Sequence, residues 1–331
     1  MRVNDEYVDR SGLFAYDRLS CLRNEYAFNE CSKCIEICPK DAFVFVRKKL
    51  RLDSDKCNSC AACIGSCPSD SLFLADETLS LKKMQNEDNP ILTCQNQKSC
   101  LAKYNSFDYI SMALESKKSF TCNVSTCKGC ELNIEDKVET FITKNIKEAN
   151  IVLKQISSYN INSLELGADP KNEVLESRRA FFRGFGKIKK EKIGLHVKSL
   201  DGVKKILKKN LLDVKDTLIN EKLSFSFGKV IDKSCTNCGE CVEFCPNKAL
   251  SYSSDKRKIL FQMAKCIGCH ICEDICKTNS VKSENIEFDL IDFAYEKMSI
   301  LISHDLRICN VCKCSFSYNG GEGIFSRCEN F

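Results

Sequence analysis

The spacing of the cysteines constrains this chain more than any other feature. From residue 235 to 276, eight cysteines follow C-x2-C-x2-C-x3-C-P and then, with twenty residues between the fourth and fifth cysteines, C-x2-C-x2-C-x3-C. A second copy, from residue 31 to 68, follows C-x2-C-x3-C-P, with C-x2-C-x2-C-x3-C-P beginning after an eighteen-residue gap. Each copy is itself doubled, so one module occurs twice and two cores of the same kind are expected.

The number and setting of the cysteines favour metal binding over disulfides. The chain has 25 cysteines among 331 residues, an odd number that cannot be fully paired within one chain. Dense disulfide frameworks belong to short secreted domains. The first twenty residues hold no apolar stretch typical of a secretory signal, and no run reaches the 18 apolar residues of a membrane span. The sequence therefore predicts a cytoplasmic protein with reduced, metal-binding thiols and no transmembrane segment.

The repeated motif is typical of iron–sulfur clusters. Three closely spaced thiolates can each bind one iron of a cluster, while the fourth cysteine, before a proline, turns toward a neighbouring cluster. At these residues the chain resembles the bacterial-type dicluster [4Fe–4S] ferredoxins. Lys277 replaces the second proline of the motif and removes no ligand. The resemblance implies two ligand sets in this copy: Cys235, Cys238, Cys241 and Cys276 for one cluster, and Cys266, Cys269, Cys272 and Cys245 for the other.

The N-terminal copy departs from the pattern at one ligand. Phe28 stands where its first cysteine is expected, and Cys21 lies seven residues further upstream. We interpret Cys21 as the replacement ligand; the alternatives are a three-iron cluster on the three remaining cysteines, or no cluster on that side. The resulting sets are Cys21, Cys31, Cys34 and Cys67 for one cluster, and Cys57, Cys60, Cys63 and Cys38 for the other.

The remaining sequence completes an α+β fold, in which two dicluster ferredoxin modules flank a small α/β domain and a short cysteine-containing tail follows. Between the modules, strands are expected at 90–94, 119–124 and 150–156, and helices at 107–118 and 131–149. The expected divisions are 1–80 (N-terminal dicluster module), 81–160 (α/β domain), 161–230 (basic helical linker), 231–290 (C-terminal dicluster module) and 291–331 (tail).

Five cysteines lie in the α/β region. Cys94 and Cys122 fall near the carboxyl ends of expected strands, where α/β layers place their sites. Cys127 and Cys130 precede a helix, and Cys100 lies one short loop beyond Cys94. Three interpretations remain open: a metal or further iron–sulfur site, with Cys94, Cys122, Cys127 and Cys130 as candidate ligands; a redox-active dithiol, which would make the region a thiol reductase; or unligated thiols.

The tail contains Cys309, Cys312, Cys314 and Cys328. This C-x2-C pair with a distant partner resembles a zinc ribbon, although a complete ribbon would have cysteine where Phe331 stands. We expect these four cysteines to bind zinc, with Cys314 as an irregular fourth ligand. Iron, or no metal, is the alternative.

The charge distribution argues against nucleic acid as a partner. The formal net charge is +5, but residues 171–215 hold 14 basic and 5 acidic residues, so the rest of the chain is at −4. A [4Fe–4S] core with four thiolates carries −2, so four clusters would bring the loaded protein to about −3. The expected surface is therefore mildly acidic with one basic strip, which would steer an acidic protein partner.

The sequence predicts an electron carrier. It contains no phosphate-binding glycine loop, no Ser–His–Asp candidate and no nicotinamide fingerprint, so no catalytic residue is assigned. The chain resembles polyferredoxin-type accessory proteins, which implies that it relays single electrons through about four [4Fe–4S] clusters to a formate dehydrogenase, a hydrogenase or a similar oxidoreductase. The alternative is an assembly or scaffolding factor for such an enzyme, in which the metal is structural.

Overall fold

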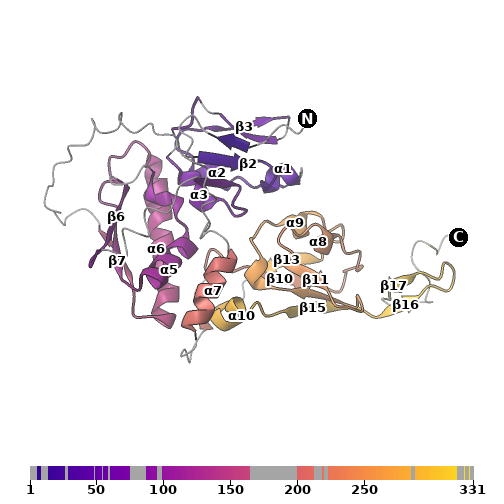
Figure 1. Cartoon of the computed structure of the whole chain (residues 1–331). Helices are drawn as coiled ribbons and strands as arrows, with labels where there is room; N and C mark the ends of the chain where they lie inside the picture. Colours follow the sequence, from indigo (N-terminus) through magenta and orange to yellow (C-terminus); the bar gives the residue numbers. More distant parts are fainter. Residues whose placement is uncertain are drawn as a thin grey trace, which may run out of the picture.

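A computed structural model describes most of the chain: residues 6–8, 14–26, 29–47, 49–53, 55–58, 60–74, 87–94, 99–164, 200–211, 218–219, 223–284 and 288–318, with 324 and 328. The predictions made for Phe28, Phe331 and most of the basic segment lie outside these residues. Figure 1 shows the order of the parts, with the N-terminal module above the C-terminal module and a hairpin projecting at the end of the chain.

The N-terminal module is built from short elements around the first cysteine repeat. A three-stranded antiparallel sheet has the order β1-β2-β5, and a second antiparallel pair, β3–β4, forms a hairpin. Tyr16 on β2 is 1% exposed and its hydroxyl donates to the Leu50 carbonyl at 3.2 Å, which ties the sheet to the hairpin. The elements are β1 (Glu6–Val8), β2 (Phe14–Asp17), α1 (Leu22–Glu25), α2 (Lys33–Ile37), β3 (Phe43–Val46), β4 (Lys49–Leu52), α3 (Ala62–Ser66) and β5 (Leu72–Leu74).

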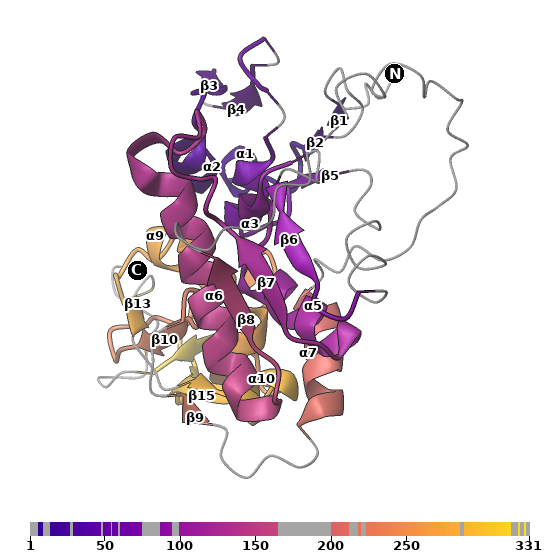
Figure 2. The same cartoon turned by 90° about the vertical axis from the view of Figure 1, so that its left-hand side faces the viewer.

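The middle region has a parallel three-stranded sheet, β6-β7-β8. Both connections run in the same direction across the sheet, so α5 and α6 lie on the same face (Figures 1 and 2). Asn105 begins α5 with a capping box completed by Asp108. The elements are β6 (Ile91–Thr93), η2 (Leu101–Lys103), α5 (Ser106–Ser116), β7 (Phe120–Asn123), η3 (Ile134–Asp136), α6 (Lys137–Ile156) and β8 (Ile161–Leu164).

The strand predicted at 150–156 is wrong. Helix α6 continues without a break to Ile156, and the third strand of the sheet is β8 instead. The run of β-branched residues suggested a strand. However, Ala149, Val152, Leu153 and Ile156 are buried at helical spacing and extend the apolar face of α6. Burial against the sheet therefore outweighed local propensity.

Helix α7 (Leu200–Asn210) and an aromatic cluster join the middle region to the C-terminal module. The ring of Phe107 on α5 lies 4.3 Å from that of Phe225 and 5.8 Å from that of Phe293. Glu148 of α6 accepts hydrogen bonds from the Ser106 hydroxyl and the Ser224 amide, each at 3.1 Å. These contacts belong to one continuous core that also includes the N-terminal module.

The C-terminal module repeats the N-terminal plan. Strands β10 and β13 pair antiparallel, and β11, β12 and β15 form a second antiparallel sheet. The expected divisions at 230 and 290 are displaced, because β10 begins before residue 231 and β15 lies beyond residue 290. The elements are β9 (Leu218–Ile219), β10 (Gly228–Ile231), α8 (Glu240–Glu243), β11 (Leu250–Tyr252), β12 (Lys258–Phe261), η5 (Met263–Lys265), α9 (Ile271–Asp274), β13 (Val281–Glu284), β14 (Phe288–Asp289), α10 (Leu290–Ala294) and β15 (Ser299–Ser303).

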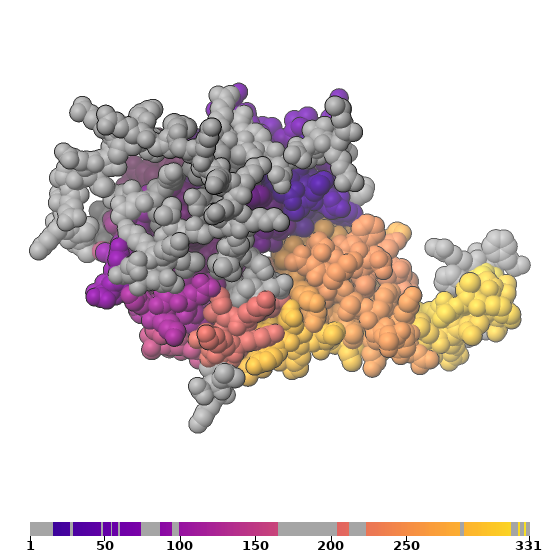
Figure 3. All heavy atoms as spheres, in the orientation of Figure 1, coloured from indigo at the N-terminus to yellow at the C-terminus, as the bar shows by residue number. Residues whose placement is uncertain are grey.

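The final described element is an antiparallel hairpin of β16 (Leu306–Ile308) and β17 (Ser315–Ser317). It extends away from the rest of the molecule (Figure 3). Within the described residues, no helix combines the length and the apolar character needed to cross a membrane.

Candidate iron–sulfur centres

The four half-modules end in the same turn. In each, the residue three positions after the fourth cysteine has a positive φ of 47–52°, namely Asp41, Asp70, Lys248 and Asn279. The chain then folds back toward the sulfur of that cysteine. The amides of Ala42, Ala249 and Ser280 donate to the sulfurs of Cys38, Cys245 and Cys276 at 3.4, 3.2 and 3.2 Å, and the Ser71 hydroxyl lies 3.2 Å from the sulfur of Cys67. Hydrogen bonds of this kind stabilise a thiolate ligand and tune cluster potential.

A second shared feature follows the middle cysteine of each complete triplet. Ala61, Gly239 and His270 have φ values of 66°, 82° and 61°, and each precedes the short helix that carries the third cysteine. Backbone turns of this kind point successive amides into one concavity, which favours an anionic group such as a cluster with four thiolates. The motif spacing thus produces the same amide-lined loop at all three complete triplets.

The C-terminal cysteines form two sites, each completed by a cysteine of the other half. Site C comprises Cys235, Cys238, Cys241 and Cys276. Site D comprises Cys245, Cys266, Cys269 and Cys272, which line one small cavity. In site C, burial, followed by the charges of the other three site C thiols, raises the pKa of Cys241 to about 12. The fourth cysteine of each half therefore lies beside the neighbouring site.

The N-terminal cysteines are grouped in the same way. Cys21, Cys31, Cys34 and Cys67 line one cavity, which we call site A. Cys38, Cys57, Cys60 and Cys63 line a second cavity, site B. Cys21 lies immediately before α1 and is 7% exposed. Four thiols thus face each cavity, a donor set that fits a [4Fe–4S] cluster.

Two residues that contact these sites were not identified from the sequence. The Tyr16 hydroxyl interacts with Cys21; burial, followed by this thiol, raises the pKa of Tyr16 well above its usual value. Lys229 is 5% exposed, forms an ion pair with Glu273 and donates to the Ser283 hydroxyl at 2.7 Å. Lys229 lies on a strand outside the cysteine motifs, so no spacing rule identifies it.

Lys229 places a buried positive charge beside site D. Burial is the main cause that raises the pKa of Cys272 to about 12, and without the opposing charge of Lys229 the pKa would be higher still. The charge of Lys229 also acts to lower the pKa of Cys266 and of Cys269. A cation in this position favours thiolate ligands and, because a reduced cluster is more negative than an oxidised one, it also favours reduction.

Sites A and D meet at Asn29. Asn29 is 3% exposed; its Nδ2 donates to the Cys269 carbonyl at 2.7 Å and its Oδ1 accepts from the Cys31 amide at 3.1 Å. One side chain therefore connects a ligand loop of the N-terminal module with a ligand loop of the C-terminal module. Cys67 of site A and Cys266 of site D also line a shared cavity of about 830 Å³. The two modules consequently face each other through sites A and D.

The middle cysteines do not gather as the predicted set. Cys122 is fully buried in the core and hydrogen-bonds with the Tyr109 hydroxyl. Cys100, which the candidate set omitted, lies with Cys94, Cys127 and Cys130 instead. The omission arose because Cys100 follows no predicted strand.

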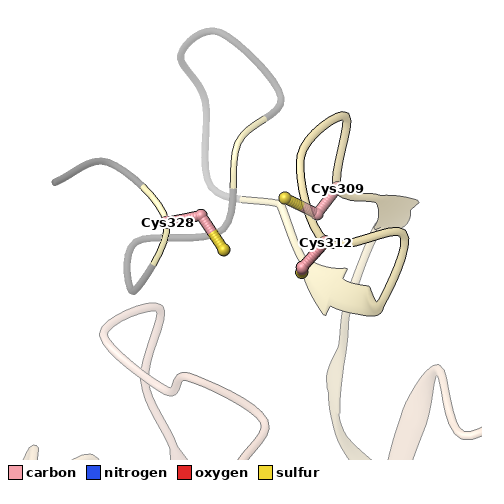
Figure 4. A group of neighbouring side chains, drawn as sticks. All are labelled: Cys309, Cys312 and Cys328. Atoms are coloured by element: carbon pink, nitrogen blue, oxygen red, sulfur yellow. The ribbon is translucent and has the colours of Figure 1, made fainter. Parts of the chain in front are cut away.

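Three tail cysteines converge. The sulfurs of Cys309, Cys312 and Cys328 lie within 4.8 Å of one another (Figure 4). Cys309 follows β16 and is fully buried, and Cys314, at the facing end of the hairpin, interacts through its thiol with Cys312. Tetrahedral zinc with bonds of about 2.3 Å holds its sulfurs about 3.8 Å apart, so the arrangement fits one ion.

Two lysines of the expected basic strip contact other side chains of the chain. Lys204 is 3% exposed and pairs with Glu296, and the Lys208 ammonium lies 5.5 Å from the centre of the Tyr295 ring. Lys205 and Lys209 are exposed on the same helix. Lys187, Lys189, Lys190 and Lys192 lie outside the described residues.

The fold and the paired thiol sites define an iron–sulfur protein. Models of a 4Fe-4S dicluster domain match residues 29–71 and 234–281. An uncharacterized ferredoxin of Methanocaldococcus jannaschii is 38% identical over 47 residues, which cover 14% of this chain and 74% of that ferredoxin. The chain belongs to the dicluster 4Fe-4S ferredoxin family, as its cysteine spacing predicted.

Two larger enzymes match this chain over a short stretch. The archaeal-type glutamate synthases [NADPH] of Thermotoga maritima and Thermotoga sp. (strain RQ2) are each 33% identical over 64 residues. That stretch covers 19% of this chain and 13% of each enzyme, so the chain spans about an eighth of their length. These findings support [4Fe–4S] clusters and electron transfer with redox partners.

Proposed function

We propose that this chain is an electron relay in which sites A, B, C and D each hold one [4Fe–4S] cluster. Each site offers four thiols, and the turns around them supply N–H donors. In site A, Cys21 takes the place of the missing motif cysteine. The cluster chemistry is a one-electron change between the 2+ and 1+ core, and the protein supplies ligands, hydrogen bonds and a fixed order of sites.

The contact at Asn29 is the observation that carries this proposal. Two ferredoxin modules tethered by a linker would exchange electrons only through chance encounters. A buried asparagine that bonds both the Cys31 loop and the Cys269 loop instead keeps sites A and D adjacent. Electrons would pass in the order C, D, A, B, or in reverse.

The partner is a redox protein, and by analogy we propose an oxidoreductase such as a formate dehydrogenase or a hydrogenase. The similarity to glutamate synthases adds a further enzyme class to this proposal. Lys205 and Lys209 would steer an acidic partner to α7. The tail site, with Cys309, Cys312, Cys314 and Cys328, would hold zinc as a structural ion.

The alternative is an assembly or scaffolding factor, because the tail hairpin projects from the body and could dock to an enzyme (Figure 3). A redox titration separates the two functions. A relay must be reduced and reoxidised reversibly at every cluster, whereas a scaffold needs only bound metal. Failure of the clusters to cycle in the intact, fully loaded chain would refute the relay.

The Asn29 contact is tested by Asn29→Asp in the reconstituted full chain. Aspartate keeps the acceptor for the Cys31 amide and loses the donor to Cys269. We expect slower electron equilibration between the two modules after photoreduction, because an unsatisfied buried group costs about 1–3 kcal/mol and loosens the junction.

Asn58→Asp is the matched control, since Asn58 accepts from the Cys60 amide at 3.3 Å in the same kind of turn, within its own module. Equal rates in both variants and wild type would show that Asn29 does not join the relay.

A further inference from the structure

A fifth thiol site lies where the middle sheet meets the N-terminal module. Cys94 directly follows β6, and β6 pairs parallel with β7 so that Thr93 lies opposite Asn123. The chain leaves β7 and turns through Cys127 and Cys130 at this edge. Because the carboxyl ends of parallel strands meet at one edge, the turn lies beside Cys94, whose sulfur is 3.7 Å from the Thr126 hydroxyl.

The turn after β7 presents two of the thiols together. The Cys127 amide donates to the Val124 carbonyl at 2.9 Å, and the Cys130 amide donates to the Cys127 carbonyl at 3.0 Å. Gly129 between them has a φ of +84° with open space where a side chain would begin. These successive turns give the C-x2-C pair a loop that resembles the ligand loops of the ferredoxin modules, where a residue with positive φ also lies between cysteines.

Cys100 completes the group and links it to site B. Its amide donates to the Cys60 carbonyl at 2.9 Å, so a ligand loop of site B touches the fifth group directly. The Cys100 thiol interacts electrostatically with Cys94, Cys60 and Cys130. The Cys127 thiol interacts in the same way with Cys100, Cys94 and Cys130. The four thiols therefore act on one another.

These four thiols do not have the close spacing that a single zinc ion requires. Among the described residues, only the tail brings three cysteine sulfurs within 4.8 Å, as one tetrahedral zinc requires. A cubane binds each cysteine to a different iron and so holds its sulfurs further apart. In this respect the middle group resembles sites A to D, and an all-thiolate donor set selects zinc or iron–sulfur clusters.

We propose that Cys94, Cys100, Cys127 and Cys130 hold a fifth [4Fe–4S] cluster, next to site B, that extends the relay of the proposed function. One electron would pass from the reduced site B cluster, which returns from 1+ to 2+, to the fifth cluster, which changes from 2+ to 1+. No bond is made or broken in the chain. The middle region is then the end of the relay opposite site C.

The test is iron, sulfide and zinc content of the full chain after anaerobic reconstitution, with Cys130→Ser as the main variant. Cys130 is exposed, so its replacement puts little packing at risk. Wild type is expected to bind about 20 iron, because five cubanes carry four iron each, and Cys130→Ser about 19 if a three-iron cluster remains or about 16 if the whole cluster is lost. Cys94→Ser is a second variant with the same expectation, and Cys122→Ser, outside the proposed site, is the control and should keep about 20.

The outcomes also separate this inference from the proposed function. About 16 iron in wild type, unchanged by Cys130→Ser, would overturn the fifth cluster and leave the four-site relay intact. Zinc lost on Cys130→Ser, in place of iron, would overturn it too. A wild type with 12 or fewer iron that still loses about four on Cys130→Ser would support the fifth cluster and refute the four-site relay.

Discussion

Replacing Lys229 with methionine tests how the protein sets the potential of one cluster. Lys229 is almost fully buried beside Cys266 and Cys272, and methionine fills nearly the same volume without the charge. A unit charge about 8 Å from another contributes about 2 kcal/mol at an effective dielectric constant of 20. For one electron this corresponds to roughly 90 mV. Since Lys229 stabilises the more negative reduced cluster, Lys229→Met should lower the site D potential by roughly this amount.

The assay is a redox titration followed by electron paramagnetic resonance on the reconstituted full chain. Glu273 is held ionised by its bonds to Lys229, Ser283 and His270, which lower its pKa to about 2 even though burial opposes this. Glu273→Gln should therefore shift the potential upward, and the double variant should return it toward wild type. Lys282→Met, an exposed lysine on β13, is the matched control and should cause little change. An unchanged site D potential in fully loaded Lys229→Met would refute the reasoning.

Further predictions concern ligands, packing and surface charge. Cys21→Ser should convert the site A cluster to a three-iron or labile form and leave sites C and D unchanged; full iron content with an unaltered spectrum would place the fourth ligand elsewhere. Gly65→Ala should destabilise the junction of α3 and η2 by about 1–3 kcal/mol in thermal unfolding, because its Cβ would lie 2.3 Å from the Ala102 carbonyl oxygen; an unchanged unfolding temperature would argue against this close contact. Cys328→Ser should remove one zinc per chain and no iron, and a zinc content equal to wild type would contradict the tail site. Lys205→Glu with Lys209→Glu should slow electron exchange with an acidic partner at low salt only, because such steering is screened; equal rates across the salt range would exclude steering by α7.

The sequence alone determined the cluster loops. Within a C-x2-C-x2-C-x3-C run the ligands are close along the chain, and their geometry depends on local turns such as those at Ala61, Gly239 and His270. The family and the cofactor follow from the same spacing. These features were predictable because they depend on neighbouring residues and on the coordination chemistry of iron.

Tertiary structure decided how distant thiols combine. The spacing rule left the upstream partner of site A open, and only packing brings Cys21 into the same cavity as Cys67. Packing also placed Cys100 against the Cys60 loop and turned Cys122 into the core, where its thiol interacts with the Tyr109 hydroxyl. Asn29 and Lys229 contribute through contacts with residues far away in sequence, which no local pattern encodes. Contacts with residues far away in sequence also explain α6, because burial of one helical face outweighed the strand propensity of residues 150–156.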